Sequence, residues 1–292
     1  MLLWPWSGAG RRVYRRQTVS LLRRNRISAF LSPHRVELVR LQRHVKPGQA
    51  ERQVAACERA GEGIAWGAAL AQLKRMLPAG TGAEIHVLLS NHFVRYAVIP
   101  PQSGIETPAE LQAYAAFQMR EIYGERTGEW ELTISSWDPA TGAVCAAVER
   151  GFLQGLEELA GSQRMKLKYV EPYFTSVFDH WHDRFGKGRA WFALIETGRL
   201  CLALLERGAW LRILNQRILD DVEEELLVAL EREALLFSAP AGTSEQVCLF
   251  APEHPGLALP EGSGWQIVPL EDKTRPAPGP LPFQSHDRDR NT

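Results

Sequence analysis

Excess charge of one sign, long apolar runs and paired cysteines are all missing from this chain of 292 residues. Lys plus Arg number 34 and Asp plus Glu number 34, so the chain has no net field that attracts nucleic acid or an anionic membrane. No uncharged apolar run approaches the roughly 20 residues that cross a bilayer. The apolar opening MLLWPWSGAG is followed rather than preceded by arginines, whereas a signal peptide has the opposite order. We therefore expect neither a spanning helix nor a cleaved leader.

Common catalytic and metal-binding signatures are also missing. The four cysteines stand singly in apolar segments, which indicates reduced core thiols and a cytosolic setting rather than a zinc or disulfide framework. Gly186-Lys187-Gly188 lacks the P-loop spacing, and no Ser or Cys lies in a nucleophile elbow. His180 and His182 are two residues apart on a predicted helix, so they point to different faces and are expected on a helix surface rather than around one metal ion.

What the chain does have is a run of three strand-like segments between Arg189 and Arg217, with breaks at Thr197-Gly198 and Arg207-Gly208. The first segment, RAWFALIE, is apolar on both faces, which predicts a central strand of a sheet. Asp220-Asp221-Val222-Glu223 then predicts the start of a helix with an acidic cap. Strand, strand, strand, helix is a building block of nucleotide-binding sheets.

The same order of elements is predicted near the start of the chain. RISAFLS and RVELVRLQR form a hairpin broken at Pro33-His34, a third strand lies around Val54, and a helix follows. Next comes a block with a predicted hairpin around Asn91 and a helix that runs from a capping box at Thr107 to about Tyr123. Further strands and helices lead to the central strand, and EQVCLFA and WQIVPLE are predicted to close the second half.

This layout resembles the actin-like ATPase (ribonuclease H-like) fold, of class α/β (α+β), with two strand-strand-strand-helix halves and a strand-and-helix insertion in the first. More narrowly, the chain is similar to the PilM family of type IV pilus assembly proteins and to the cytoplasmic domain of the type II secretion protein GspL. The resemblance covers about residues 26–270. It is carried by ISAFLSPHRVELVRL, VLLSNHFVRYAVIPPQ, ALIETGRLCLALLERGAWLRILNQRI, and LVALEREALLF followed by EQVCLFAP.

The resemblance implies a division of the chain into segments. Residues 1–25 form a basic N-terminal arm, and residues 26–165 form a first actin-like subdomain with its insertion at about residues 83–150. Residues 166–271 form a second actin-like subdomain. Residues 272–292 are rich in proline and charge, which predicts a tail without fixed structure.

Two of three expected nucleotide-binding elements depart from the family pattern. In the first turn, FLSPH, Phe30 and Leu31 stand where the family has small or acidic residues, and Pro33 restricts the turn and removes an N–H donor. In the second segment, Glu196, Thr197 and Gly198 stand where the family has Asp-x-Gly, so they are the candidate cofactor-binding residues. The competing interpretation, which we favour, is a plain hairpin turn flanked by solvated charges, and Arg199 beside the turn could neutralise the acid. Ala251-Pro252-Glu253 replaces the Gly-Gly pair that admits adenosine.

The sequence therefore predicts a non-catalytic scaffold, or pseudo-ATPase, that serves as an assembly component of a type IV pilus or type II secretion-like machine. The alternative is a divergent, ATP-binding regulatory ATPase of the same fold, with Mg²⁺ as its metal. No cofactor and no metal are expected for the scaffold. The location implied by the resemblance is cytoplasmic and peripheral to the inner membrane.

By resemblance, the partner is the cytoplasmic segment of a single-span inner-membrane protein that is PilN-like. The implied groove lies near residues 87–100, with Val94, Tyr96 and Val98 on one face of a strand, where a sheet edge accepts an extended peptide. The competing interpretation is that these three residues are ordinary core.

The arm contains Arg11, Arg12, Arg15 and Arg16, which could hold it on an anionic membrane surface at about 1 kcal/mol for each cation. A solvated arm without a partner is an equal alternative. Arginines near tryptophans also suit nucleic acid, which ranks behind both and is not the expected partner.

Overall fold

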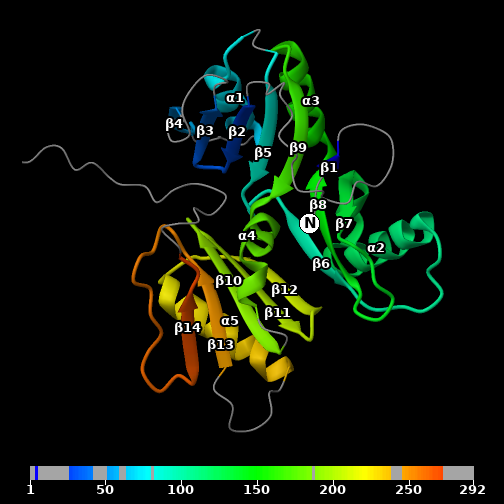
Figure 1. The fold of residues 1–292 in the computed structure, drawn as a ribbon, viewed down its shortest axis with the longest axis vertical. Coiled ribbons are helices and arrows are strands. Elements are labelled where there is room, and N and C mark those ends of the chain that lie inside the picture. Colours follow the sequence, from blue (N-terminus) through cyan, green and yellow to red (C-terminus); the bar gives the residue numbers. More distant parts are fainter. Residues whose placement is uncertain are drawn as a thin grey trace, which may run out of the picture. The chain divides into compact units, whose positions relative to one another are not determined.

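The computed structural model describes residues 4–5, 26–41, 51–58, 64–79, 82–185, 188–237 and 245–271. The chain divides into two compact units, Met1–Asp179 and His180–Thr292 (Figure 1). Residues 272–292 and most of residues 1–25 lie outside the described residues, so the tail and the arm stay predictions. No helix in the described part of the chain is long and apolar enough to cross a membrane.

The first unit is built on a six-stranded mixed sheet of order β1-β9-β5-β2-β3-β4. β2 and β3 form the predicted antiparallel hairpin, while β5 pairs in parallel with both β2 and β9. The elements of this layer are β1 (Trp4–Pro5), β2 (Arg26–Leu31), β3 (Arg35–Leu41), β4 (Glu51–Ala56), α1 (Gly67–Met76), β5 (Glu84–Leu89), α3 (Arg150–Ser162), β9 (Lys166–Pro172) and α4 (Tyr173–Trp181).

One face of this sheet is apolar and packs against α1 and α3. Alternate residues of β2 and β5 supply that face, as expected from the two-residue period of a strand. The two helices also contact each other, because the Trp66 ring stacks on Phe152 with centroids 5.2 Å apart and the Trp66 Nε1–H donates to Glu149 at 2.7 Å. The buried residues of the two strands are Ile27, Ala29, Leu31, Ile85, Val87 and Leu89.

A separate three-stranded sheet of order β6-β8-β7 forms the insertion. Its helix begins at the predicted capping box, in which Thr107 and Glu110 bond each other's backbone N–H groups, and ends before Gly124. Ala115 and Met119 of this helix are buried on one face of the sheet. The elements are β6 (Arg95–Ile99), α2 (Pro108–Tyr123), the 3₁₀ helix η1 (Gly124–Glu129), β7 (Trp130–Ile134) and β8 (Ala143–Glu149).

Three expectations for this unit need correction. The hairpin around Asn91 is wrong, because β5 belongs to the six-stranded sheet and β6 to the three-stranded one. The insertion therefore begins after β5 rather than at residue 83. The first unit also extends to Asp179 rather than to residue 165, since β9 pairs along β5 and belongs to the first sheet.

The second unit is a five-stranded sheet of order β12-β11-β10-β13-β14, with the predicted central strand β10 in the middle. β10, β11 and β12 are antiparallel neighbours, while β13 and β14 continue the sheet in parallel. The elements are η2 (His182–Arg184), β10 (Arg189–Glu196), β11 (Arg199–Glu206), β12 (Ala209–Arg217), α5 (Val222–Leu236), β13 (Glu245–Phe250) and β14 (Trp265–Pro269).

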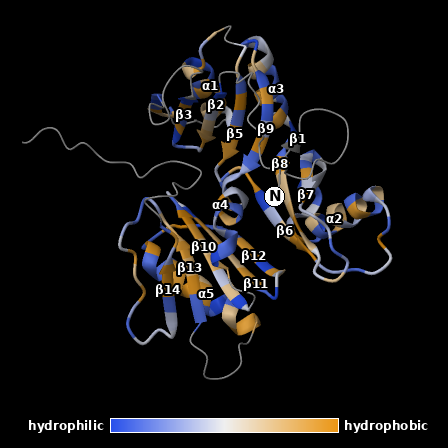
Figure 2. Ribbon diagram, viewed as in Figure 1, coloured by the Kyte–Doolittle hydropathy of each residue, from blue (hydrophilic) through white to orange (hydrophobic). Residues whose placement is uncertain are grey.

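The sheet of the second unit buries the most apolar strands of the chain against α5 (Figure 2). The helix begins where the sequence predicted, because the Asp221 carboxylate accepts the backbone N–H groups of Glu223 and Glu224 at 2.9 and 3.0 Å. Arg207 and Gly208 both have positive φ, the geometry of the tight turn that suits two twisted antiparallel strands.

Candidate functional site

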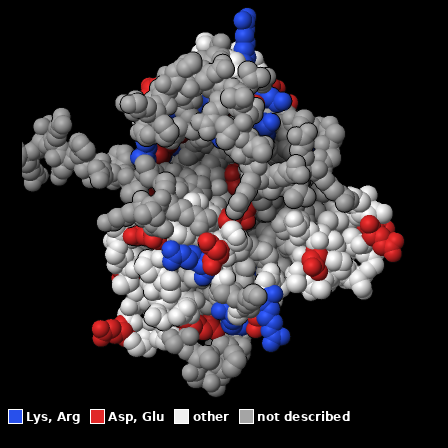
Figure 3. Space-filling view, viewed as in Figure 1, with Lys and Arg blue, Asp and Glu red and all other residues white. Residues whose placement is uncertain are grey.

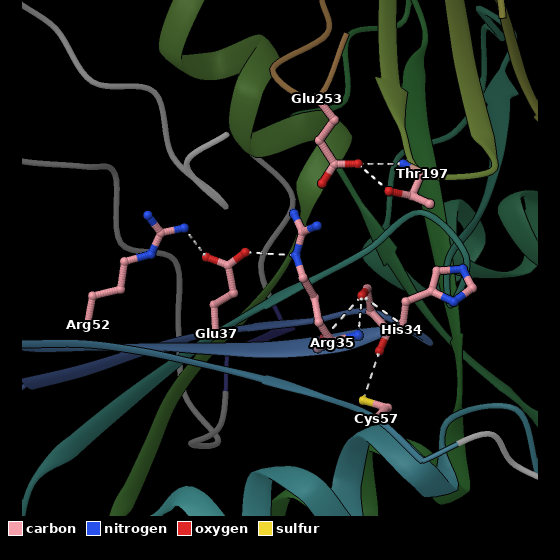
Figure 4. A network of polar contacts seen from close by, with 8 residues as sticks. His34, Arg35, Glu37, Arg52, Cys57, Thr197 and Glu253 are labelled. Atoms are coloured by element: carbon pink, nitrogen blue, oxygen red, sulfur yellow. Dashed lines mark hydrogen bonds and ion pairs between the residues drawn. The ribbon is translucent and has the colours of Figure 1, made fainter. Parts of the chain in front are cut away.

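The first candidate site is the turn between β2 and β3, where the resemblance places a phosphate contact. The Ser32 hydroxyl accepts the backbone N–H groups of His34 (3.3 Å) and Arg35 (3.1 Å), and it donates to the Arg35 carbonyl (3.0 Å) (Figure 4). Ser32 itself is 7% exposed. Pro33 has no N–H, so the donors that a phosphate would need at this turn are absent or already bonded to Ser32.

The surroundings of this turn tie it further to its own unit. The Cys57 N–H donates to the His34 carbonyl at 2.8 Å, and the Cys57 thiol lies 3.7 Å from the Ser32 carbonyl oxygen. Burial raises the pKa of that thiol, so Cys57 stays protonated. Beyond the turn, the buried Glu37 carboxylate pairs with Arg35 (2.8 Å) and Arg52 (2.6 Å). The Arg35 guanidinium is therefore also engaged within the unit.

The second candidate site is the Thr197-Gly198 turn between β10 and β11. It is a two-residue hairpin turn with Gly198 at φ 71°, as the favoured interpretation of the sequence has it. The Glu253 carboxylate accepts the Thr197 backbone N–H at 2.9 Å and also accepts the Thr197 hydroxyl (Figure 4). A carboxylate of the chain itself therefore occupies the donors that would face an anion at this turn.

Glu196 and Arg199 flank the same turn. They are partners across the β10–β11 ladder and are 6% and 8% exposed. Residues directly opposite on antiparallel strands share one face of the sheet. Both charged side chains are nearly buried, so the expectation that solvated charges flank the turn is wrong. Within the described residues no group of three or more His, Cys, Asp or Glu side chains has a metal-binding arrangement.

The segment that replaces the adenosine-binding Gly-Gly pair supplies the closing carboxylate. Ala251, Pro252 and Glu253 follow β13, and the His254 N–H turns back to the Ala251 carbonyl at 3.0 Å. The Ala251–Glu253 segment thus contacts the Thr197-Gly198 turn through Glu253. The sequence showed the loss of the glycines but gave no signal for this contact between residues 56 positions apart.

The three candidate partner residues lie on or beside β6 and differ in exposure. Val94 is 0% and Tyr96 is 2% exposed, while Val98 is half-buried. The Tyr96 hydroxyl donates to Asn91 Oδ1 at 2.7 Å, and its ring packs on Phe174 at 5.5 Å. Val94 and Tyr96 are thus core residues, as in the competing interpretation, and Val98 is the member of the three that a partner can reach.

Asn91 is a residue whose role sequence reasoning missed. It is 0% exposed, and besides Tyr96 it also accepts the Phe174 backbone N–H at 3.2 Å. This single amide fixes the end of β5, the start of β6 and the first turn of α4. Its place between two apolar strands predicts a hairpin turn, whereas its side chain joins three elements.

Two buried titratable groups lie on strands of the six-stranded sheet. Burial raises the pKa of the Glu171 carboxyl to about 7, against a hydrogen bond from Ser176, and Asp179 raises it further. Burial also lowers the pKa of the His86 imidazole to about 4, and the positive charge of Arg26 adds to that effect. Neither group lies at the two turns. We therefore expect their protonation to affect the stability of the first unit rather than a site at the turns.

The two sheets with their strand-strand-strand-helix order, and the inserted sheet in the first unit, define an actin-like fold. No protein-family model matches the chain, and no curated protein sequence does either. Solved structures are similar to it at low sequence identity, which establishes the fold alone.

Three of these structures superpose on this chain with TM-scores above 0.5. The cytoplasmic domain of EpsL, an inner membrane component of the type II secretion system of Vibrio cholerae, superposes with a TM-score of 0.54 at 12% identity, over 86% of this chain and 92% of that one. The PilM-PilN type IV pilus biogenesis complex gives 0.54 at 17% identity, over 84% and 87%. A protein of unknown function with an actin-like ATPase fold from Bacteroides thetaiotaomicron gives 0.52 at 10%, over 77% and 81%.

Proposed function

We propose that this chain is a non-catalytic assembly component of a pilus or type II secretion-like machine, which binds the cytoplasmic segment of an inner-membrane partner. Similarity to a PilM-PilN complex and to an EpsL cytoplasmic domain supports the class of machine and the kind of partner. The absence of nucleotide chemistry is supported by the two turns.

The observation that carries the proposal is the contact between Glu253 and Thr197. A nucleotide phosphate at this turn would have to displace a carboxylate or lie beside it, and two like charges at such distances repel each other. The first turn adds to this, since the Ser32 hydroxyl already accepts its N–H groups. These donors of His34, Arg35 and Thr197 already have acceptors within the chain, which supports the proposal.

The partner surface proposed on the insertion is the outer edge of β6. Within the described residues this strand pairs with β8 along one edge. The Tyr123 hydroxyl donates to the Tyr96 carbonyl, so we place the added peptide strand along the other edge beyond Tyr96, at Val98. The half-buried Val98 lies on the face opposite α2, at the position where β6 pairs with Val144 of β8. An extended apolar peptide at this edge would contact Val98 directly.

Calorimetric titration with ATP, with and without Mg²⁺, tests the non-catalytic part. We expect no saturable binding at millimolar ATP for the native chain. The Glu253→Ala variant removes the competing carboxylate, and Glu261→Ala, in the same segment between β13 and β14, is its matched control. Saturable micromolar binding by the native chain would overturn the proposal in favour of the ATP-binding alternative, and Glu196 would then be the first residue to mutate.

Pulldown with the cytoplasmic segment of a PilN-like protein tests the partner edge. We expect Val98→Lys to abolish capture, because it places a charge beside the proposed peptide. Thr133→Lys is the matched control, since Thr133 is a half-buried residue on β7, the opposite outer strand of the same sheet. Equal capture by both folded variants would rule out the β6 edge.

A further inference from the structure

Positive side chains gather where the parallel strands of the first unit begin. Arg26 starts β2, and in the sheet register it is paired with Glu84 of β5, which is paired in turn with Lys166 of β9. Arg164 lies two residues before Lys166, and Lys168 lies two residues after it. Arg164 and Lys166 are exposed, and Arg26 and Lys168 are half-buried. Figure 3 shows blue side chains at the end of the first unit where β5 and β9 begin.

Carboxylates are also present at this end. Glu84 stands between Arg26 and Lys166 in the register, the exposed Glu157 and Glu158 lie in the last turns of α3, and Glu51 is 3.7 Å from Arg40. No described carboxylate forms an ion pair with Arg164, Lys166 or Lys168. The low pKa of the His86 imidazole, to which burial, Arg26 and Lys168 contribute, agrees with a positive local potential despite the opposing Glu84.

Two segments outside the described residues are also rich in cations in the sequence. β1 is antiparallel to β9, with Trp4 opposite Val170 and Pro5 opposite Tyr169. Residues 6–25 then lead to Arg26, and they contain six arginines and no acid. Residues 42–50 join β3 to β4, whose Arg40 and Glu51 are register partners, and they contain Arg43 and Lys46 without an acid.

We propose that this end of the six-stranded sheet docks on an anionic membrane surface, with Arg26, Arg164, Lys166 and Lys168 as its described contact residues. Cations at the starts of neighbouring strands form one front that a charged lipid surface can contact at once. Such surfaces attract clusters of Lys and Arg with a short range set by salt. This docking is independent of the partner role proposed above.

A nucleic acid fits these observations less well. Single-strand binding uses aromatic rings with free faces on which bases stack. Tyr169, next to these cations, has Lys168 over its ring at 5.7 Å and His86 against it at 5.0 Å. The chain as a whole is also neutral, so its attraction to polyanions is confined to this end.

Sedimentation of the full chain with vesicles tests the proposal, using phosphatidylcholine alone or with about a third phosphatidylglycerol at physiological ionic strength. We expect binding to the anionic vesicles only. The triple variant Arg164→Gln, Lys166→Gln, Lys168→Gln should lower the partition coefficient about 100-fold, since each cation near the surface contributes about fivefold. Capture of the PilN-like segment should not change.

The matched control is Arg120→Gln, Arg126→Gln, Arg150→Gln, which removes the same charge from α2, η1 and the start of α3. We expect it to lose less than about threefold, because these residues belong to the insertion and to the start of α3, whose other end leads to Arg164. Equal losses for the two triples would overturn the proposal in favour of a net-charge effect, and so would absence of binding to anionic vesicles. Tighter binding to a single-stranded oligonucleotide, with displacement from vesicles, would replace the membrane by nucleic acid.

Discussion

The two hairpin turns that the resemblance assigns to phosphate are closed in different ways. In the first unit the closing group is the hydroxyl of Ser32, a member of the turn itself. In the second unit it is the carboxylate of Glu253, which reaches Thr197 from 56 residues away. A hydroxyl within the turn stabilises it independently of the rest of the unit. A distant carboxylate also joins two segments of the unit and adds a negative charge. The backbone N–H groups of the two turns thus find their acceptors by separate routes.

The largest expected effect is at the first turn. Ser32→Ala leaves the N–H groups of His34 and Arg35 without their acceptor at a nearly buried site, so we expect the free energy of unfolding to fall by about 2–3 kcal/mol. Urea unfolding followed by hydrogen exchange of β2–β3 peptides measures this loss and assigns it to the first unit. Ser32→Thr keeps the hydroxyl and serves as control. A loss below about 0.5 kcal/mol for Ser32→Ala would mean that water replaces the hydroxyl.

Most of the strands and helices near these turns could be predicted, because apolar alternation and caps are local signals. The β2–β3 hairpin, the Thr107 capping box and the central position of β10 are confirmed. The hairpin at Asn91 failed because strand pairing is decided by partners distant in sequence: β5 pairs with β2 and β9, which no pattern around Asn91 encodes.

The candidate site was less predictable than the fold. Ser32 before Pro33 is a local turn signal, since a serine hydroxyl bonds backbone groups two or three residues on, and it was available in the sequence. The contact from Glu253 to Thr197 depends on how β13 pairs with β10, so a sequence alone could not reveal it. The burial of Tyr96 follows from Phe174 and Asn91, and it too depends on long-range packing.

The second prediction separates the two units by pH. The carboxyl of Glu171 has a pKa of about 7 in the folded chain against 4.5 in the unfolded one, so the folded state binds its proton more tightly. Stability of the first unit should therefore fall by about 2 kcal/mol as pH rises from about 5 to 8. Glu171→Gln should remove this fall, while the exposed Glu158→Gln should not.

The His86 imidazole gives the opposite slope at lower pH. Its pKa is lowered to about 4 from 6.5, so the unfolded state binds more protons in that window and stability falls as pH drops through it. In the Glu171→Gln variant, the fall in stability at low pH that His86 causes should remain, while the fall at higher pH should disappear. Unfolding midpoints from hydrogen exchange of β5 peptides at about pH 4 to 8 measure both. A flat profile for the native first unit, with no fall above pH 6.5, would contradict the assignment to Glu171.

The third prediction tests the distant closure. Glu253→Gln removes the charge of the acceptor and weakens two charge-assisted hydrogen bonds to Thr197, so we expect a loss of about 1 kcal/mol confined to the second unit. Hydrogen exchange at Thr197 and in β11 should increase, and exchange in β2–β3 should not. Glu261→Gln is the control. A Thr197→Val, Glu253→Gln double-mutant cycle with no coupling energy would show that the two residues do not stabilise each other.

The smallest expected effect concerns the backbone of the second turn. Gly198 has φ 71°, a conformation that a side chain disfavours, whereas the described residues of the Ser32 turn adopt no positive φ. Gly198→Ala should therefore cost about 1 kcal/mol, and Gly198→Asn less, since asparagine tolerates this region. Urea midpoints of the two variants measure the difference. An equal cost for both variants would mean that space around the turn, rather than φ, decides which residue position 198 accepts. The contact with the distant Glu253 carboxylate would then hold the turn too tightly for any side chain there.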